Sequence, residues 1–136
     1  TSFDWSPARN APRAAPAILD LGDVQVLAEV MLNGMNLGTL WCAPYRADIS
    51  SVIRPGVNQL EIRAASLWPN RMIGDAQLPE VGGARRNGLA AAWPEWLLNG
   101  EPIPNGRVAW AAYEPFRKDS PLVPSGLIGP VTIQSE

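Results

Sequence analysis

Histidine is absent from the 136 residues, and cysteine occurs only once, as Cys42. Nucleophilic sites of the Ser-His-Asp and Cys-His types need an imidazole base, so both are excluded. A structural zinc site is disfavoured as well, because one thiol without imidazoles cannot supply four ligands. A single cysteine forms no disulfide within the chain, and we expect Cys42 to be a small, half-buried apolar residue.

Charge and long apolar runs are also scarce. The formal net charge is −2, with 11 basic against 13 acidic residues, whereas a nucleic-acid partner requires a basic face. No apolar run approaches the roughly 20 residues of a membrane-spanning helix. Hydrophobic residues still make up 46% of the chain, which suits one buried core and argues against disorder. We therefore expect a single domain over residues 1–136 that binds neither nucleic acid nor a membrane.

Tryptophan and proline are plentiful instead, with six and 14 residues. Proline fixes φ and lacks an amide donor, so this many prolines indicate many loops and few long helices. Tryptophan is large and apolar, and its indole N–H needs a partner when it is buried. Together they predict an all-β domain with long structured loops and at most one or two short helices.

The clearest strand pattern is the period-two alternation from Val26 to Leu32, which predicts a strand with one face in the core. Asn33-Gly34 follows and predicts a type I′ hairpin turn. Returning and further strands are expected over residues 35–41, 18–21, 45–49, 60–64, 107–113 and 126–134. Residues 1–17 are expected to hold a partial first strand and an exposed Ala/Pro-rich loop. About seven short strands favour a β-sandwich.

Two stretches lie outside this strand pattern. Residues 66–75, "SLWPNRMIGD", are expected to form a rigid loop at one end of the sandwich. Trp93, Trp96 and Leu97 recur at one-turn spacing, so a short helix is expected to begin near Pro94. The last strand, "GLIGPVTIQ", offers core candidates at Leu127, Val131 and Ile133.

The stretch "LAEVMLNGMNLGTLWCAPYRADISSVIRPGVNQLEIRAASLWPNRMIGD" resembles the sugar-binding-type sandwich domain of glycoside hydrolases. Family 2 enzymes, such as β-galactosidases and β-mannosidases, carry its "NG", "LG" and "PGVNQLEIR" features loosely. The segments "LWPNRMIGDAQLP", "WPEWLLNG" and "KDSPLVPSGLIGPV" narrow the resemblance to the C-terminal domain of family 106, the α-L-rhamnosidase-like enzymes. The resemblance covers roughly residues 18–136.

This resemblance implies a galactose-binding-like jelly roll, with catalysis in a separate barrel domain of a larger glycosidase. It also favours a periplasmic or extracellular location. The chain departs from the family by starting inside the first strand, and the resulting open sheet edge predicts self-association. Two functions stay open: an accessory domain that supports the catalytic barrel and contacts carbohydrate, and a free-standing carbohydrate-binding module.

One group of residues combines the chemistry that binds sugars. Indole and phenol rings stack on the C–H faces of pyranoses, while Arg and Asn hydrogen-bond to neighbouring hydroxyls. The alternative is that the tryptophans are core residues or loop anchors, and that the arginine pairs with Asp75 or caps carbonyls. The candidates are Trp41, Tyr45, Trp68, Asn70 and Arg71.

Trp93 and Trp96 form a second candidate aromatic face, for docking or for sugar, beside Glu95. The alternative is that these rings cover one end of the sandwich. Glu95 and Glu114 come nearest to a catalytic pair, but no pattern places them at the few-ångström separation that a glycosidase needs. We therefore expect no catalysis by this chain.

Four aspartates could offer oxygen ligands to Ca²⁺, as in some galactose-binding-like domains. Their spacing matches no calcium loop, so we expect turn-capping carboxylates and no cofactor. These residues are Asp20, Asp23, Asp48 and Asp75. Arg85-Arg86, next to Gly82-Gly83, is expected to be a solvated loop.

Overall fold

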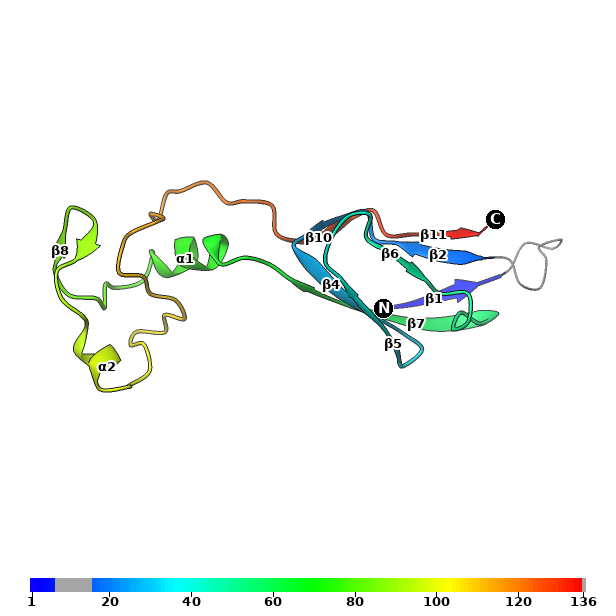
Figure 1. The fold of residues 1–136 in the computed structure, drawn as a ribbon, viewed down its shortest axis with the longest axis horizontal. Coiled ribbons are helices and arrows are strands. Elements are labelled where there is room, and N and C mark those ends of the chain that lie inside the picture. The colour runs from blue at the N-terminus through cyan, green and yellow to red at the C-terminus, as the bar shows by residue number, and fades with distance from the viewer. Residues whose placement is uncertain (7–15, 136) are drawn as a thin grey trace. The chain divides into compact units, whose positions relative to one another are not determined.

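The structure is a computed structural model that describes residues 1–6 and 16–135. The chain groups into two compact units (Figure 1). We call Thr1–Leu67 with Pro124–Glu136 the sandwich unit, and Trp68–Val123 the insert unit. The single domain over residues 1–136 stays a prediction. The expected Ala/Pro-rich loop falls largely on residues 7–15, which lie outside the described residues.

The sandwich unit is built from antiparallel strands. A four-stranded sheet has the order β1-β7-β4-β5, a three-stranded sheet the order β11-β2-β6, and β10 pairs with β3. The two larger sheets face each other across the core (Figure 1). The strands are β1 (Ser2–Trp5), β2 (Ala17–Asp20), β3 (Asp23–Gln25), β4 (Leu27–Leu32), β5 (Met35–Leu40), β6 (Arg46–Asp48), β7 (Gly56–Ala65), β10 (Gly126–Gly129) and β11 (Thr132–Ser135). The prediction of an all-β sandwich is confirmed, while the jelly-roll strand order stays a prediction.

The core lies where the period-two pattern placed it. Ala28, Val30 and Leu32 alternate along β4, and all three are buried. Side chains from both larger sheets meet them, because successive residues of a strand point to opposite faces. The buried cluster consists of Ala17, Leu19, Leu21, Val24, Ala28, Val30, Leu32, Ile49, Val52 and Leu60.

Two asparagines fix the turns of the sandwich. Asn33 and Gly34 have φ angles of 52° and 81°, so the type I′ turn between β4 and β5 is confirmed. Asn33 Nδ2 donates to Asn58 Oδ1 at 2.8 Å. Asn58 is fully buried and donates to the carbonyls of Arg54 and Gly56, at 2.7 and 2.8 Å. The "NG" and "PGVN" segments are thus joined by buried amide hydrogen bonds.

The insert unit contains both helices. They are α1 (Pro69–Asp75) and α2 (Glu95–Leu98), and β8 (Arg85–Arg86) pairs with β9 (Leu89–Ala90). Helix α2 confirms the helix expected near Pro94. The rigid loop expected over residues 66–75 is wrong, because most of it is α1. Pro69 occupies the first turn, where its missing amide breaks no helical bond.

Further expectations are corrected. Cys42 is exposed and not half-buried. Arg85 and Arg86 form strand β8 and not a solvated loop. Residues 107–113 form no strand, because the Val108 and Ala109 amides donate to the Asp75 carboxylate. Residues 126–134 form two strands in different sheets, β10 and β11, separated at Pro130, which has no amide to donate. Of the three expected core residues there, only Ile133 packs against the core.

Among the residues that the structure describes, strand β1 pairs only with β7 and forms one edge of its sheet. Self-association through this edge stays a prediction. Within residues 1–6 and 16–135, no helix has the length and apolar character needed to cross a membrane.

Candidate functional site

The insert unit buries little apolar surface and exposes much. Apart from Pro94, Ile73 is the one apolar side chain in it that is buried, among the residues the structure describes. Isolated exposed apolar residues are ordinary, but many on a small unit mark a candidate interaction surface. The large exposed ones are Trp68, Leu89, Trp93, Leu97, Leu98, Val108, Tyr113, Leu122 and Val123. We call them the exposed apolar set.

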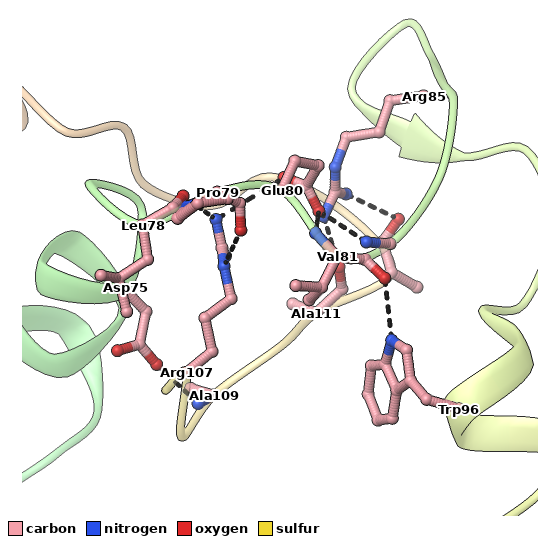
Figure 2. A network of polar contacts seen from close by, with 12 residues as sticks. Asp75, Leu78, Pro79, Glu80, Val81, Arg85, Trp96, Arg107, Ala109 and Ala111 are labelled. Atoms are coloured by element: carbon pink, nitrogen blue, oxygen red, sulfur yellow. Dashed lines mark hydrogen bonds and ion pairs between the residues drawn. The ribbon is translucent and has the colours of Figure 1, made fainter. Parts of the chain in front are cut away.

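Asp75, at the end of α1, holds the helix to the segment around residue 108. Its side chain is almost fully buried, and Oδ2 accepts the amides of Val108 and Ala109 at 2.8 and 2.6 Å (Figure 2). Its Oδ1 pairs with Arg71 Nη2 at 2.8 Å. Burial raises the pKa of Asp75, but the two amides and Arg71 outweigh it and hold that pKa below its usual range. The expected alternative for Arg71, pairing with Asp75, is present.

Asn70 connects the start of α1 to the end of the insert unit. Its Nδ2 donates to the Val123 carbonyl at 2.8 Å, and its Oδ1 accepts the Val123 amide at 2.9 Å. The side-chain amide therefore uses both of its polar atoms on one backbone unit. In this arrangement Asn70 closes the insert unit, so a sugar hydroxyl would have to compete with these bonds.

Arg107 and Glu80 fix the chain that follows α1 (Figure 2). Arg107 donates to the carbonyls of Pro79 and Leu78 at 2.8 and 2.7 Å. Glu80 Oε1 accepts the amides of Gly82 and Val81 at 2.9 and 3.1 Å. Burial raises the pKa of Glu80, but these amides and the neighbouring arginines outweigh it and lower that pKa. The loop over residues 78–82 is thus held by directed polar contacts.

Three tryptophans gather in the insert unit. The ring centroids of Trp93 and Trp96 each lie 5.9 Å from that of Trp110, a spacing typical of favourable aromatic pairs. Trp96 Nε1 donates to the Val81 carbonyl at 2.8 Å (Figure 2). The expected aromatic face does bring Trp93 and Trp96 together, but around Trp110. Sequence reasoning missed Trp110, because the alternation of residues 107–113 assigned it to a strand.

Two hollows border this cluster. A groove of about 690 Å³ is lined by Trp93, Trp96 and the polar side chains of Glu95, Asn99 and Glu101, which is within the roughly 300–1,000 Å³ of small-molecule sites. A smaller cavity of about 60 Å³ is lined by residues that include Glu80, Arg85, Arg107, Trp110 and Glu114.

Two buried donors of residues that line this cavity, Arg85 Nε and Trp110 Nε1, have no partner among the described residues. The volume is enough for ordered water, which commonly satisfies such groups.

The five sugar-binding candidates are divided between the two units. Trp41 and Tyr45 belong to the sandwich unit, and Trp68, Asn70 and Arg71 to the insert unit. Trp41 is 73% exposed and Trp68 is 58% exposed, so both indoles are accessible. Tyr45 packs against the core, and its hydroxyl donates to the Val26 carbonyl at 3.1 Å. Sugar binding by these residues stays a prediction.

The candidate catalytic carboxylates open to different hollows. Glu95 lines the groove, whereas Glu114 lines the smaller cavity. No observation pairs them across a common space, as a glycosidase would require.

Of the other three calcium candidates, Asp20 and Asp48 cap turns, whereas Asp23 binds a side chain. Asp20 accepts the Gly22 amide at 2.9 Å and Arg46 Nε at 2.7 Å, and these two contacts lower its pKa. Asp48 accepts the hydroxyl and amide of Ser50, which lower its pKa. Asp23 accepts Gln25 Nε2 at 3.0 Å. Within residues 1–6 and 16–135, no three Asp, Glu, Cys or His residues gather into a possible metal site. Cofactor content stays a prediction.

No protein-family model matches the sequence. A protein of Formosa agariphila named "Putative beta-glucuronidase" is 45% identical over 115 residues, which is 85% of this chain and 10% of that protein. The solved structure of a rhamnosidase from Novosphingobium sp. PP1Y matches 100% of this chain and 10% of its own, at 38% identity and a TM-score of 0.70. A Bifidobacterium dentium β-glucuronidase, solved with coumarin-3-O-glucuronide, matches 99% of this chain and 20% of its own. Its 19% identity and TM-score of 0.55 show likeness of fold alone.

The chain spans about a tenth of the length of the curated relative and of the rhamnosidase. The similarity is therefore to one domain-sized part of these glycoside hydrolases and not to a whole enzyme. The resemblance to rhamnosidase-like glycoside hydrolases is confirmed.

Proposed function

We propose that this chain is a non-catalytic accessory domain of a rhamnosidase-like glycoside hydrolase, and that its insert unit contacts the catalytic barrel. Besides the similarity to glycoside hydrolases, one observation supports this proposal. The insert unit buries only two apolar side chains, Ile73 and Pro94, beside the nine members of the exposed apolar set. Such a unit gains stability when another surface covers it, because each Å² of apolar area removed from water contributes about 25 cal/mol.

The internal contacts of the insert unit suit this task. Asp75, Asn70 and Arg107 each bind backbone groups far away in the sequence. These bonds hold the loops in a defined conformation although the apolar core is small. A surface that is already ordered loses less conformational entropy on binding, which favours association.

The chemistry of the chain supports a non-catalytic role. It has no histidine, and its two candidate carboxylates, Glu95 and Glu114, line different hollows. In the proposed arrangement the barrel carries out hydrolysis, and this chain supports the barrel.

The test uses the Novosphingobium rhamnosidase lacking the tenth of its chain that this protein matches. We expect the 136-residue chain, added in trans, to form a complex that calorimetry detects. Trp68→Ala and Leu98→Ala should weaken the complex, since both side chains are exposed in the insert unit. Trp41→Ala is the matched control, because Trp41 is an exposed tryptophan of the sandwich unit.

Activity of the isolated chain would contradict the proposal. We expect it to leave aryl rhamnosides and aryl glucuronides intact. Cleavage that disappears with Glu95→Gln or Glu114→Gln would show that the chain itself is an enzyme.

A free-standing carbohydrate-binding module is the second candidate function. The observation that favours it is the exposure of two separate indoles, Trp41 and Trp68. If it is correct, the isolated chain binds sugar through one of these rings and forms no complex with the truncated rhamnosidase.

A further inference from the structure

We infer that the groove beside Trp93 is a binding subsite for a neutral saccharide, with Trp93 as the stacking platform. The inference concerns the groove residues of the insert unit and goes beyond the proposed docking role. It rests on the proposed function only for the choice of sugars tested.

Trp93 is held in position and still accessible. The residue is 59% exposed, and it lines the groove. The Trp110 ring supports it, at 5.9 Å between centroids and an interplanar angle of 56°. Trp110 is itself contacted by Trp96 and by the Arg85 guanidinium, each at 5.9 Å. An apolar ring that is fixed by neighbours and open on the groove side suits the C–H face of a pyranose.

Hydrogen-bonding groups lie next to this platform. The groove is also lined by Glu95, Asn99 and Glu101. These three side chains come from the short stretch of residues 95–101, where the Asn99 backbone amide donates to the Glu95 carbonyl at 2.9 Å. Asn99 Nδ2 donates to Glu101 Oε1 at 3.4 Å. Carboxylate oxygens accept hydrogen bonds from hydroxyls, and a side-chain amide can both donate and accept. A ring platform with a few directed polar groups is the usual composition of a sugar site.

The charge of the groove selects the class of sugar. Glu95 and Glu101 both line it, and no lysine or arginine does among the residues that the structure describes. A uronic acid would place its carboxylate near these two carboxylates and be repelled. A hexose or deoxyhexose meets no such repulsion, so the subsite takes neutral sugars.

The test is an NMR titration of the ¹⁵N-labelled 136-residue chain with L-rhamnose and, separately, with D-glucuronic acid. We expect saturable shifts of the Trp93 and Trp96 indole N–H signals with L-rhamnose, with a dissociation constant of roughly 1–10 mM. We expect D-glucuronic acid to bind at least about fivefold more weakly. Trp93→Ala should weaken L-rhamnose binding at least about tenfold.

Trp93→Ala also removes a contact with Trp110, so a second variant keeps the inference falsifiable. Glu101→Lys, at an exposed position, offsets the charge of the remaining Glu95 and should remove most of the preference for L-rhamnose over D-glucuronic acid. The matched control is Glu114→Lys, an exposed glutamate that does not line the groove, and it should leave the preference unchanged.

Three results would overturn the inference. They are shifts confined to Trp41 or Trp68, equal binding of the two sugars, and no saturable shift at about 100 mM L-rhamnose, well above the expected dissociation constant. If sugars fail but the truncated rhamnosidase shifts the Trp93 signal, the groove docks protein instead. The docking proposal would then stand without the sugar subsite, so the two failures can be distinguished.

Discussion

The sandwich unit and the insert unit are stabilised in different ways. In the sandwich unit, buried apolar residues outnumber large exposed ones, and ten of them form one cluster. In the insert unit, large exposed apolar side chains outnumber buried ones: the exposed apolar set has nine members, whereas the buried apolar side chains are Ile73 and Pro94. There, Asp75, Asn70 and Arg107 bind backbone groups directly.

This difference suits the two units to different roles, the sandwich unit to stability and the insert unit to contact with a partner. Apolar packing tolerates exchange of similar side chains, whereas a buried polar contact depends on both partners, and losing one leaves the other unsatisfied. The sandwich unit therefore suits the role of a scaffold. The insert unit uses its polar side chains to hold its shape, which leaves its apolar side chains available for a partner.

The largest expected effect is a cavity in the sandwich core. Leu32 is 1% exposed, and Leu32→Ala should lower the free energy of unfolding by about 2–5 kcal/mol. Urea unfolding followed by far-ultraviolet circular dichroism measures it. The control is Leu98→Ala, because Leu98 is 69% exposed, and it should change the free energy by at most about 0.5 kcal/mol. Equal effects of the two variants would remove the contrast between the units.

The next effect concerns the polar contacts of the insert unit. Asp75→Ala leaves the amides of Val108 and Ala109 and the Arg71 guanidinium without their acceptor. We expect a loss of about 2–3 kcal/mol in the insert unit, measured by hydrogen exchange of those two amides. Asp119→Ala is the control, since Asp119 is an exposed aspartate of the same unit. Unchanged protection of both amides in Asp75→Ala would contradict the role given to this carboxylate.

Acid should weaken the same contacts by a smaller amount, because a protonated carboxyl can still accept a hydrogen bond. The folded-state pKa values of Asp75 and Glu80 are lowered. Their stabilisation is therefore fully present above the unfolded values of about 4 and is lost as the pH falls through the lower folded values. We expect the insert unit to loosen below about pH 4 while the sandwich core persists.

The NMR signals of the indole N–H groups, followed as the pH is lowered, measure the loosening of each unit separately. Trp5 and Trp41 report on the sandwich unit, and the other four report on the insert unit, namely Trp68, Trp93, Trp96 and Trp110. Loss of all six signals in one step would mean that the units share one cooperative transition.

The smallest effects come from two glycines of the insert unit. A Cβ at Gly82 would overlap Trp110 Nε1, so Gly82→Ala should destabilise the unit by about 1–2 kcal/mol. Gly74 lies within α1, and nothing would touch its Cβ within 4 Å. Gly74→Ala should stabilise the helix by about 0.5–1 kcal/mol. Thermal unfolding of the two variants measures both changes in stability. If both variants changed the stability in the same direction, Gly82 would not be tightly packed.

The sandwich unit could be predicted because its determinants are local. Period-two alternation identified Ala28, Val30 and Leu32 as core residues, and Asn33-Gly34 specified its own turn. The insert unit could be predicted less well because its determinants are distant. Residues 107–113 alternate like a strand, yet Asp75 takes the amides of Val108 and Ala109.

In the candidate site, too, contacts between residues near in sequence could be predicted better than contacts between distant ones. The helical spacing of Trp93 and Trp96 does not explain their arrangement, because Trp93 lies before α2. Both rings contact Trp110 instead, which the spacing did not identify. The pairing of Arg71 with Asp75 was one of the alternatives offered for the expected loop, and the structure forms it as an i,i+4 contact within α1. The groove was not predictable, because its lining joins residues 81–84 to residues 91–101.

The central claim is that the insert unit contacts the catalytic barrel. The most direct measurement is the ¹⁵N spectrum of the six indole N–H groups before and after adding the rhamnosidase that lacks the matching segment. The account predicts that the Trp68 signal shifts and becomes protected from exchange while the Trp41 signal stays in place. A shifted Trp41 with an unchanged Trp68, or no shift at all, would contradict it.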